Sequence, residues 1–179
     1  DIVHSGILRI AATAALRLDG AFTESGGGPV ELAGIIATTA DPITFNGQVK
    51  LIDGSQGSAL LSTAAGPNPG GADIRFVQSV NGETSGLENL LLDSGTVGDI
   101  LFDGPAGNTV RLGGIAIVDA RDVRFSQILV AATFVQLDGE RTTAFGGAVD
   151  LSHPTAAALN ATTANVTSAG PLTTSGAGT

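Results

Sequence analysis

The chain contains no cysteine, methionine, tryptophan or tyrosine among its 179 residues, and seven phenylalanines are its only aromatic side chains. The absence of cysteine excludes disulfide bonds and cysteine-ligated metal sites. Large aromatic and thioether side chains commonly fill irregular pockets and anchor ligands, so their absence disfavours an enzyme with a deep cleft. The hydrophobic fraction of 42% still suffices for a core built from Val, Ile, Leu, Ala and Phe. Such a core suits regular layers.

Cationic side chains are also scarce. Lys and Arg together number 8 against 17 Asp and Glu, which gives a formal net charge of −9. Nucleic acids and anionic membrane surfaces are bound by clustered Lys and Arg, so neither is expected as a partner. No apolar run approaches the ~18 residues that a membrane-spanning helix requires, and membrane insertion is not expected.

Helical periodicity is missing as well, because Gly and Thr-rich runs interrupt each candidate helix. Short runs instead alternate apolar and polar side chains, as strands with one buried face do. Examples are residues 7–10, 16–18, 30–32, 49–52 and 115–118. Gly, Asn, Asp and Ser separate these runs, which is where turns need them. The pattern predicts an all-β fold.

A motif of an apolar residue, any residue and Phe, followed closely by Gly or Gln, recurs along the chain. It occurs at 43–47, 74–78, 100–104 and 123–127, with a degenerate copy at 143–147. The intervals between its Phe residues are 31, 26, 23 and 20 residues. Such a repeat is typical of a parallel β-solenoid, and we predict about seven or eight coils of roughly 20–31 residues. The expected core stack consists of Phe22, Phe45, Phe76, Phe102, Phe125 and Phe145.

A second repeat links the end of the chain to an internal segment. Residues 22–29 and 172–179 share the pattern apolar-Thr-x-Ser-Gly-small-Gly-x. The internal copy at 22–29 is followed by the apolar-polar-apolar run 30–32. If another copy of residues 1–3 followed Thr179, the junction, or seam, between two units would have a similar sequence. Residues 1–179 are therefore interpreted as a single β-solenoid segment, about one unit of a tandem repeat array in a longer chain.

Four phrases of the sequence carry a family resemblance, at 43–49, 100–104, 142–149 and 170–176. They resemble the giant β-strand-repeat surface proteins of bacteria, of the filamentous-haemagglutinin and autotransporter-adhesin kind. The resemblance implies a right-handed parallel β-helix in a long secreted chain, located outside the cell or on its surface. That family has no catalytic residues to carry over. This sequence departs from its common pattern by placing Arg within strands where Thr, Ser or Asn is usual.

Five arginines lie between apolar neighbours, which directs their side chains outward from the expected strands. They are Arg9, Arg17, Arg75, Arg111 and Arg124. One interpretation is a solvated surface with weak ion pairs between adjacent coils. The alternative is a lateral contact face, on which the arginines of one filament meet the acidic surface of the next.

Several acidic positions are candidate sites of chemistry. The dipeptide Asp-Gly follows an apolar residue at 18–20, 52–54, 102–104 and 137–139, and Asp119 and Asp122 flank Arg121. Asp-Gly at a strand end is first a turn, although calcium binding or catalysis remain alternatives. Residues 70–73 begin like a calcium-binding nonapeptide but lack its third Gly. His4 and His153 have no neighbours at ligand spacing, so no zinc site is proposed.

These observations favour a structural or adhesive segment of a long extracellular fibre, and no enzyme. Its expected partners are copies of itself, end to end or side by side, and host or cell-surface glycans. No cofactor is expected, with calcium as the one candidate. The alternatives are a carbohydrate-active β-helix enzyme, which would need sugar-stacking aromatics, and a calcium-stiffened spacer that carries an adhesive tip.

Overall fold

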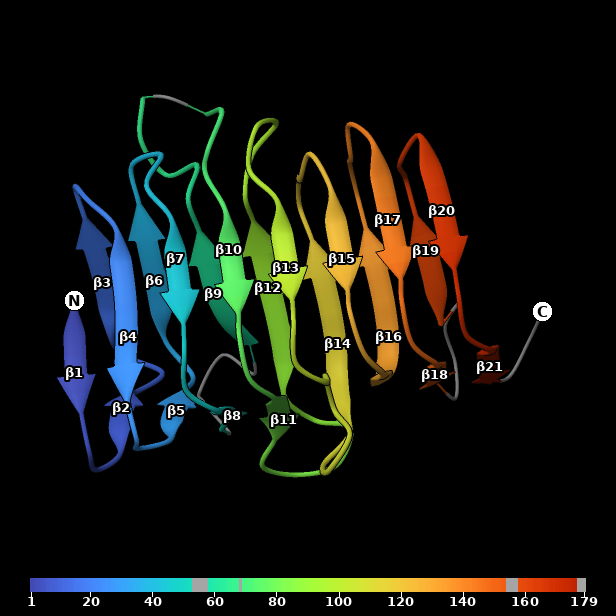
Figure 1. Ribbon diagram of the computed structural model, residues 1–179, viewed down its shortest axis with the longest axis horizontal. Coiled ribbons are helices and arrows are strands. Elements are labelled where there is room, and N and C mark those ends of the chain that lie inside the picture. Colours follow the sequence, from blue (N-terminus) through green and yellow to red (C-terminus); the bar gives the residue numbers. More distant parts are fainter. Residues whose placement is uncertain (53–57, 68, 154–157, 177–179) are drawn as a thin grey trace.

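The chain winds through three sheets in turn, so that strands one coil apart in sequence lie side by side (Figure 1). This computed structural model describes residues 1–52, 58–67, 69–153 and 158–176. The described residues form strands and contain no helix, and neighbouring strands within each sheet run parallel. The predicted all-β parallel solenoid is confirmed.

The first sheet has eight strands and extends over the whole length of the molecule. In spatial order they are β1 (Ile2–His4), β4 (Phe22–Gly26), β7 (Ile43–Phe45), β10 (Ile74–Phe76), β13 (Ile100–Phe102), β15 (Val123–Phe125), β17 (Thr142–Phe145) and β20 (Asn165–Ser168). The second sheet contains β2 (Leu8–Ile10), β5 (Val30–Leu32), β8 (Val49–Leu51) and β11 (Val80–Gly82).

The third sheet starts at β3. In the later coils, beyond the last strand of the second sheet, its strands also occupy the side of the rod that the second sheet forms in the first coils. Its strands are β3 (Ala15–Leu18), β6 (Ile35–Thr38), β9 (Ser58–Ser62), β12 (Asn89–Asp93), β14 (Leu112–Ile117), β16 (Leu129–Gln136), β18 (Val149–His153), β19 (Leu159–Ala161) and β21 (Leu172–Gly176). The long strand β16 joins the two sides, since its first residues pair with β18 and its last with β19.

Coil length varies as the Phe intervals predict. Residues paired across the first sheet are 20 to 31 positions apart in sequence. The longest coil separates Ile43 from Ile74, and its connection between β9 and β10 projects beyond the neighbouring coils in Figure 1. The strands of the first sheet span about seven turns, and a strand spacing of ~4.8 Å makes the rod ~34 Å long.

Phenylalanine rings stack along the interior of the first sheet. Phe76, Phe102 and Phe125 are directly in register, and their ring centroids are 4.7 and 4.5 Å apart with nearly parallel planes. Phe45 and Phe145 extend the stack at both ends, with ring centroids 5.5 Å from those of Phe76 and Phe125, respectively. Phe134 of β16 packs its edge against Phe125 and Phe145 from the opposite wall. The predicted stack therefore forms the centre of the core.

Phe22 belongs to the core but occupies a different position in the ladder. It pairs with Ile43, two residues before Phe45, and its ring is tilted by 53° against that of Phe45. The position opposite Phe45 is taken by Glu24. The interval of 23 residues between Phe22 and Phe45 therefore differs from the true coil length of 21 at this point.

The corner after the first sheet explains why Gly or Gln follows each Phe. A Cβ atom on Gly104 would lie 2.4 Å from the backbone carbon of Gln78, and one on Gly147 would lie 2.5 Å from that of Gln127. Glycine is thus required where one coil crosses closely over another. Gln78 instead donates its side-chain amide to the carbonyl of Asn46 at 2.9 Å. The motif is therefore a property of coil stacking.

The two segments that share the seam pattern lie in different sheets. Residues 22–26 form β4 of the first sheet, whereas 172–176 form β21 of the third sheet. Residues 177–179, which complete the second copy, are outside the described residues. The shared pattern therefore does not place the two segments at equivalent points of a coil.

Candidate functional site

The five outward arginines lie on three different sides of the solenoid. Arg75 and Arg124 belong to the first sheet, Arg9 to the second and Arg17 to the third, and all four are exposed. Arg111 precedes β14 and is half-buried. The predicted outward orientation holds for the four strand arginines. The structure does not bring the five together into one continuous face.

Arg75 and Arg124 share one outward ladder of the first sheet, with Leu101 between them. The Nε of Arg75 is 2.7 Å from an oxygen of Asp103, and the Nε of Arg124 donates to the Ser126 hydroxyl at 3.0 Å. Both side chains are exposed, so these contacts contribute little to stability. Their guanidinium groups remain accessible for a neighbouring molecule.

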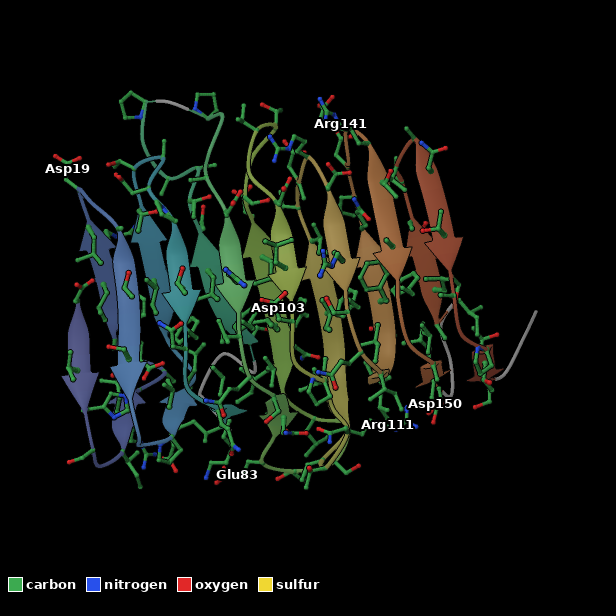
Figure 2. All side chains as sticks on the ribbon, viewed as in Figure 1. Asp19, Glu83, Asp103, Arg111, Arg141 and Asp150 are labelled. Carbon is green, nitrogen blue, oxygen red and sulfur yellow. The ribbon has the colours of Figure 1, made fainter. Side chains whose placement is uncertain are left out.

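Arg111 lies at a corner, where it holds two later coils together (Figure 2). Its guanidinium donates to the carbonyl of Ala131 at 2.7 Å and to the carboxylate of Asp150 at 2.8 Å. A guanidinium suits this position because it offers several donors in a fixed plane. The role of Arg111 in this structure is therefore to brace neighbouring coils.

An alternating row of charges runs along the outer surface of the second sheet. Glu31 lies between Arg9, at 3.5 Å, and Lys50, at 2.8 Å, and Lys50 also contacts Glu83 at 3.4 Å. The hydrogen bond from Lys50 lowers the pKa of Glu31, and the same bond raises the pKa of Lys50. These cross-coil pairs match the expected solvated surface with ion pairs one coil apart.

The Asp-Gly positions lie at corners on different sides of the rod. Asp19 follows the third sheet and accepts a hydrogen bond from the Thr39 hydroxyl at 2.7 Å, whereas Asp103 follows the first sheet (Figure 2). Asp138 accepts the backbone N–H of Gly139 at 2.8 Å. Residues 53 and 54 are outside the described residues. The turn interpretation fits these placements, which distribute the carboxylates over separate corners.

Asp119 and Asp122 have different environments although Arg121 lies between them. Arg121 makes two short contacts with Asp99, at 2.8 and 2.6 Å, and a looser one with Asp122 at 3.8 Å. One buried oxygen of Asp119 has no hydrogen-bond partner. Burial, followed by the nearby charge of Asp138, raises the pKa of Asp119. Asp119 is therefore a desolvated carboxyl at a corner, and Asp122 is part of a coil-bracing network.

The calcium-like stretch 70–73 serves as a turn that contacts the next coil. Gly71 has φ of +68°, and a Cβ there would lie 1.9 Å from the carbonyl oxygen of Ser94. Asp73 accepts the backbone N–H of Asp99 at 2.9 Å. Among the described residues, three or more His, Asp or Glu side chains never gather as a metal-binding group. The described residues therefore contain no cluster of side chains that would support calcium binding.

The first coils contain a buried ion pair that interrupts the Phe stack. Glu24 is fully buried, and one of its oxygens is 2.7 Å from Nε2 of His4. The other oxygen accepts the backbone N–H of Gly47 at 2.9 Å. Nδ1 of His4 lies 2.7 Å from the carbonyl oxygen of Gly6. A carbonyl oxygen and a carboxyl group therefore face the two ring nitrogens of His4, an arrangement that favours the imidazolium.

This pair makes the first coils sensitive to pH. The hydrogen bond to the Gly6 carbonyl, and then the hydrogen bond and charge of Glu24, raise the pKa of His4 above its ordinary value against the effect of burial. A raised pKa means that the stabilisation is fully present below about pH 6.5 and is lost as pH rises through the folded-state pKa. Above it, the buried Glu24 side chain faces a neutral imidazole.

We expect the Gly27 and Gly47 amides, which bond to His4 and Glu24, to lose protection from hydrogen exchange as pH rises through that pKa. The measurement is amide exchange by NMR between about pH 5 and 9, corrected for the intrinsic rate. A His4→Gln variant should show no such transition. A transition that survives in the variant would contradict this origin.

Sequence reasoning missed the contact between His4 and Glu24. The two residues are 20 positions apart, close to one coil, which was the available signal. Glu24 also sits two residues after Phe22, on the same side of its strand. Alternation from Phe22 places Glu24 on the core face, but register decides that it lies opposite Phe45, and short apolar patterns do not fix register this finely.

No protein-family model matches this chain, and no curated protein or solved structure matches it either. In the part of the chain that the structure describes, there is no helix with the length and apolar character needed to cross a membrane.

Proposed function

We propose that this chain is a structural and adhesive segment of a long extracellular or cell-surface fibre and that it acts without catalysis. The proposed parent is a bacterial surface protein of the β-strand-repeat kind, like the filamentous haemagglutinins and autotransporter adhesins. The parallel solenoid supports this proposal, because each coil offers its edge to the next and the fold can be extended indefinitely.

The observation that carries the proposal is the exposed core at both ends of the rod. Val166 of β20 is 49% exposed, whereas Thr143, its partner in the next inner coil, is fully buried. Leu172 of β21 is 43% exposed against 2% for its partner Val149. At the other end, Leu8 is half-buried while Val30 beside it is fully buried. Another coil stack covering these ends would remove apolar surface from water.

The strand edges at the two ends of the rod would also be covered by another coil stack. β1, β2 and β3 end their sheets on one side, and β20 and β21 end theirs on the other. Unpaired parallel edges favour pairing with another chain. A head-to-tail contact brings one end against the opposite end of the next copy, and such contacts propagate into filaments. Side-by-side contact between rods is proposed to use the exposed Arg75 and Arg124.

We expect the isolated chain to associate as its concentration rises, measured by sedimentation velocity. Val3→Pro puts a proline into the outermost strand β1, a change that blocks edge pairing, and should keep the protein monomeric. One blocked end suffices, because each contact needs both kinds of end.

The matched control is Val3→Thr, which keeps the backbone N–H and should associate like the unmodified chain. Val3 is 79% exposed, so neither change alters the core. Monomeric behaviour of the unmodified chain at high concentration would contradict end-to-end assembly.

A further inference from the structure

A groove of about 690 Å³ lies at the corner between the first and second sheets. It is found around β8 and β11, and the connection from β13 to β14 forms one wall (Figure 1). Five successive coils contribute residues to it, from Pro29 at one end to Gln127 at the other. With ~4.8 Å between coils, the groove follows the rod axis for ~19 Å.

Side-chain amides dominate the polar lining of this groove. They come from four successive coils, with two of them in one coil, and are Gln48, Gln78, Asn81, Asn108 and Gln127. Each amide offers two donors and an acceptor oxygen with two lone pairs. Gln78 and Gln127 each donate one hydrogen bond to a backbone carbonyl of the preceding coil, at 2.9 and 3.0 Å. These bonds orient the two amides and leave most of their capacity for a ligand.

The wall of the groove is held in place by one of these amides. The Asn81 side-chain oxygen accepts the backbone N–H groups of Thr109 and Val110, at 2.9 and 3.3 Å. Its NH₂ group keeps its two donors. Gly107, at the start of this wall, has φ of +72° and donates its N–H to the carbonyl of Val80 at 2.7 Å. The groove is therefore preformed.

The charge of the groove selects against ionic ligands. Among the described residues that line it, Lys50 is the only charged one, and its ammonium is already paired with Glu31 and Glu83. Clustered unpaired cations, which anionic polymers need, are therefore missing from the lining. Pro29, Pro105 and Val77 add apolar surface between the amides. A neutral ligand with alternating hydroxyl and C–H surfaces matches this lining.

An extended peptide fits less well than a sugar chain. Peptides that bind to sheets add a strand at a free edge. The groove instead crosses coils whose strands are already paired on both sides, such as β8 between β5 and β11. It presents side-chain amides, and these bind hydroxyl groups as donors and acceptors.

We propose that this groove binds a neutral polysaccharide lying along the rod axis. The inference deepens the adhesive part of the proposed function and rests on it. Failure here would leave fibre formation intact, because association is measured separately by sedimentation. Failure of association would likewise leave binding by single rods measurable.

The test is native affinity electrophoresis in gels that contain dextran, mannan or xyloglucan, with heparin and casein gels for comparison. We expect retardation by at least one neutral polysaccharide and none by heparin or casein. A Gln48→Ala/Asn108→Ala variant should bind at least ~10-fold more weakly, because it removes two amides from the groove. Both residues are exposed, so the melting temperature should hold.

The matched control is Asn160→Ala/Asn165→Ala, which removes two exposed amides from β19 and β20, away from the groove. Its retardation should equal that of the unmodified chain. The proposal is overturned by mobility unchanged in all three neutral gels, or by equal loss in both double variants. Retardation by heparin or casein alone would reassign the groove to an anionic polymer or a peptide and would also overturn it.

Discussion

Replacing Phe102 by alanine is expected to lower the free energy of unfolding by about 3–5 kcal/mol. The side chain is fully buried, and its ring stacks at 4.7 Å on Phe76 and at 4.5 Å on Phe125. The substitution leaves a cavity in the middle of the stack and removes ring contacts on both sides. Equilibrium urea unfolding followed by circular dichroism measures the change.

The control for this prediction is the neighbouring residue of the same strand. Leu101 faces outward between Arg75 and Arg124 and is half-buried. Leu101→Ala should cost less than about 1 kcal/mol, since a surface substitution leaves no cavity. Equal losses from the two variants would contradict the assignment of inward and outward positions in the first sheet.

Replacing Gly107 by alanine is expected to destabilise the protein by about 3 kcal/mol or more. Its φ of +72° disfavours a side chain, and a Cβ would lie 1.9 Å from the carbonyl oxygen of Val130 in the next coil. That oxygen belongs to the backbone, so the two coils must separate. The hydrogen bonds of Gly107 to Val80 and of Val130 to Ala106 would then weaken.

Gly86→Ala separates the two parts of this effect. Gly86 has a similar φ of +80°, but a Cβ there would meet no atom within 4 Å. Alanine should therefore cost about 1 kcal/mol at this position, from backbone strain alone. The difference between the two variants in urea unfolding measures the close approach of the coils. Equal effects would mean that the approach at Gly107 is less tight than described.

Much of this fold can be predicted from the sequence because a solenoid repeats one physical constraint. Phe45, Phe76, Phe102 and Phe125 each follow an apolar residue at the same spacing, so their strands all present the same side to the core. The range of 20 to 31 residues for a coil follows from these positions together with Phe145. The outward orientation of Arg9, Arg75 and Arg124 follows from strand alternation.

Other features depend on contacts between coils that sequence spacing does not determine. Alternation puts an arginine outside, but the side of the rod depends on where each corner falls within a coil of variable length. Arg17 and Arg75 therefore lie on different sheets despite similar local sequences. Register also decides that Glu24, and not Phe22, lies opposite Phe45. A shift of two residues along a strand leaves the same side chains facing the core, so alternation alone does not reveal it.

The groove was also beyond prediction from the sequence. Its amides are spread over residues 48 to 127, and they converge only because four coils stack in this register. The Gln or Gly that follows each Phe is visible in the sequence, where it is part of a repeat that predicts a solenoid. Its consequence for the surface required knowledge of which residues lie above one another.

In the proposed function, the solenoid continues from one copy into the next through its ends. Electron cryo-microscopy of the concentrated protein is the most direct test of this continuation. We expect filaments one solenoid wide, with strands perpendicular to the axis and an axial repeat of ~4.8 Å. Isolated rods of ~34 Å at every concentration, or filaments with strands along the axis, would contradict it.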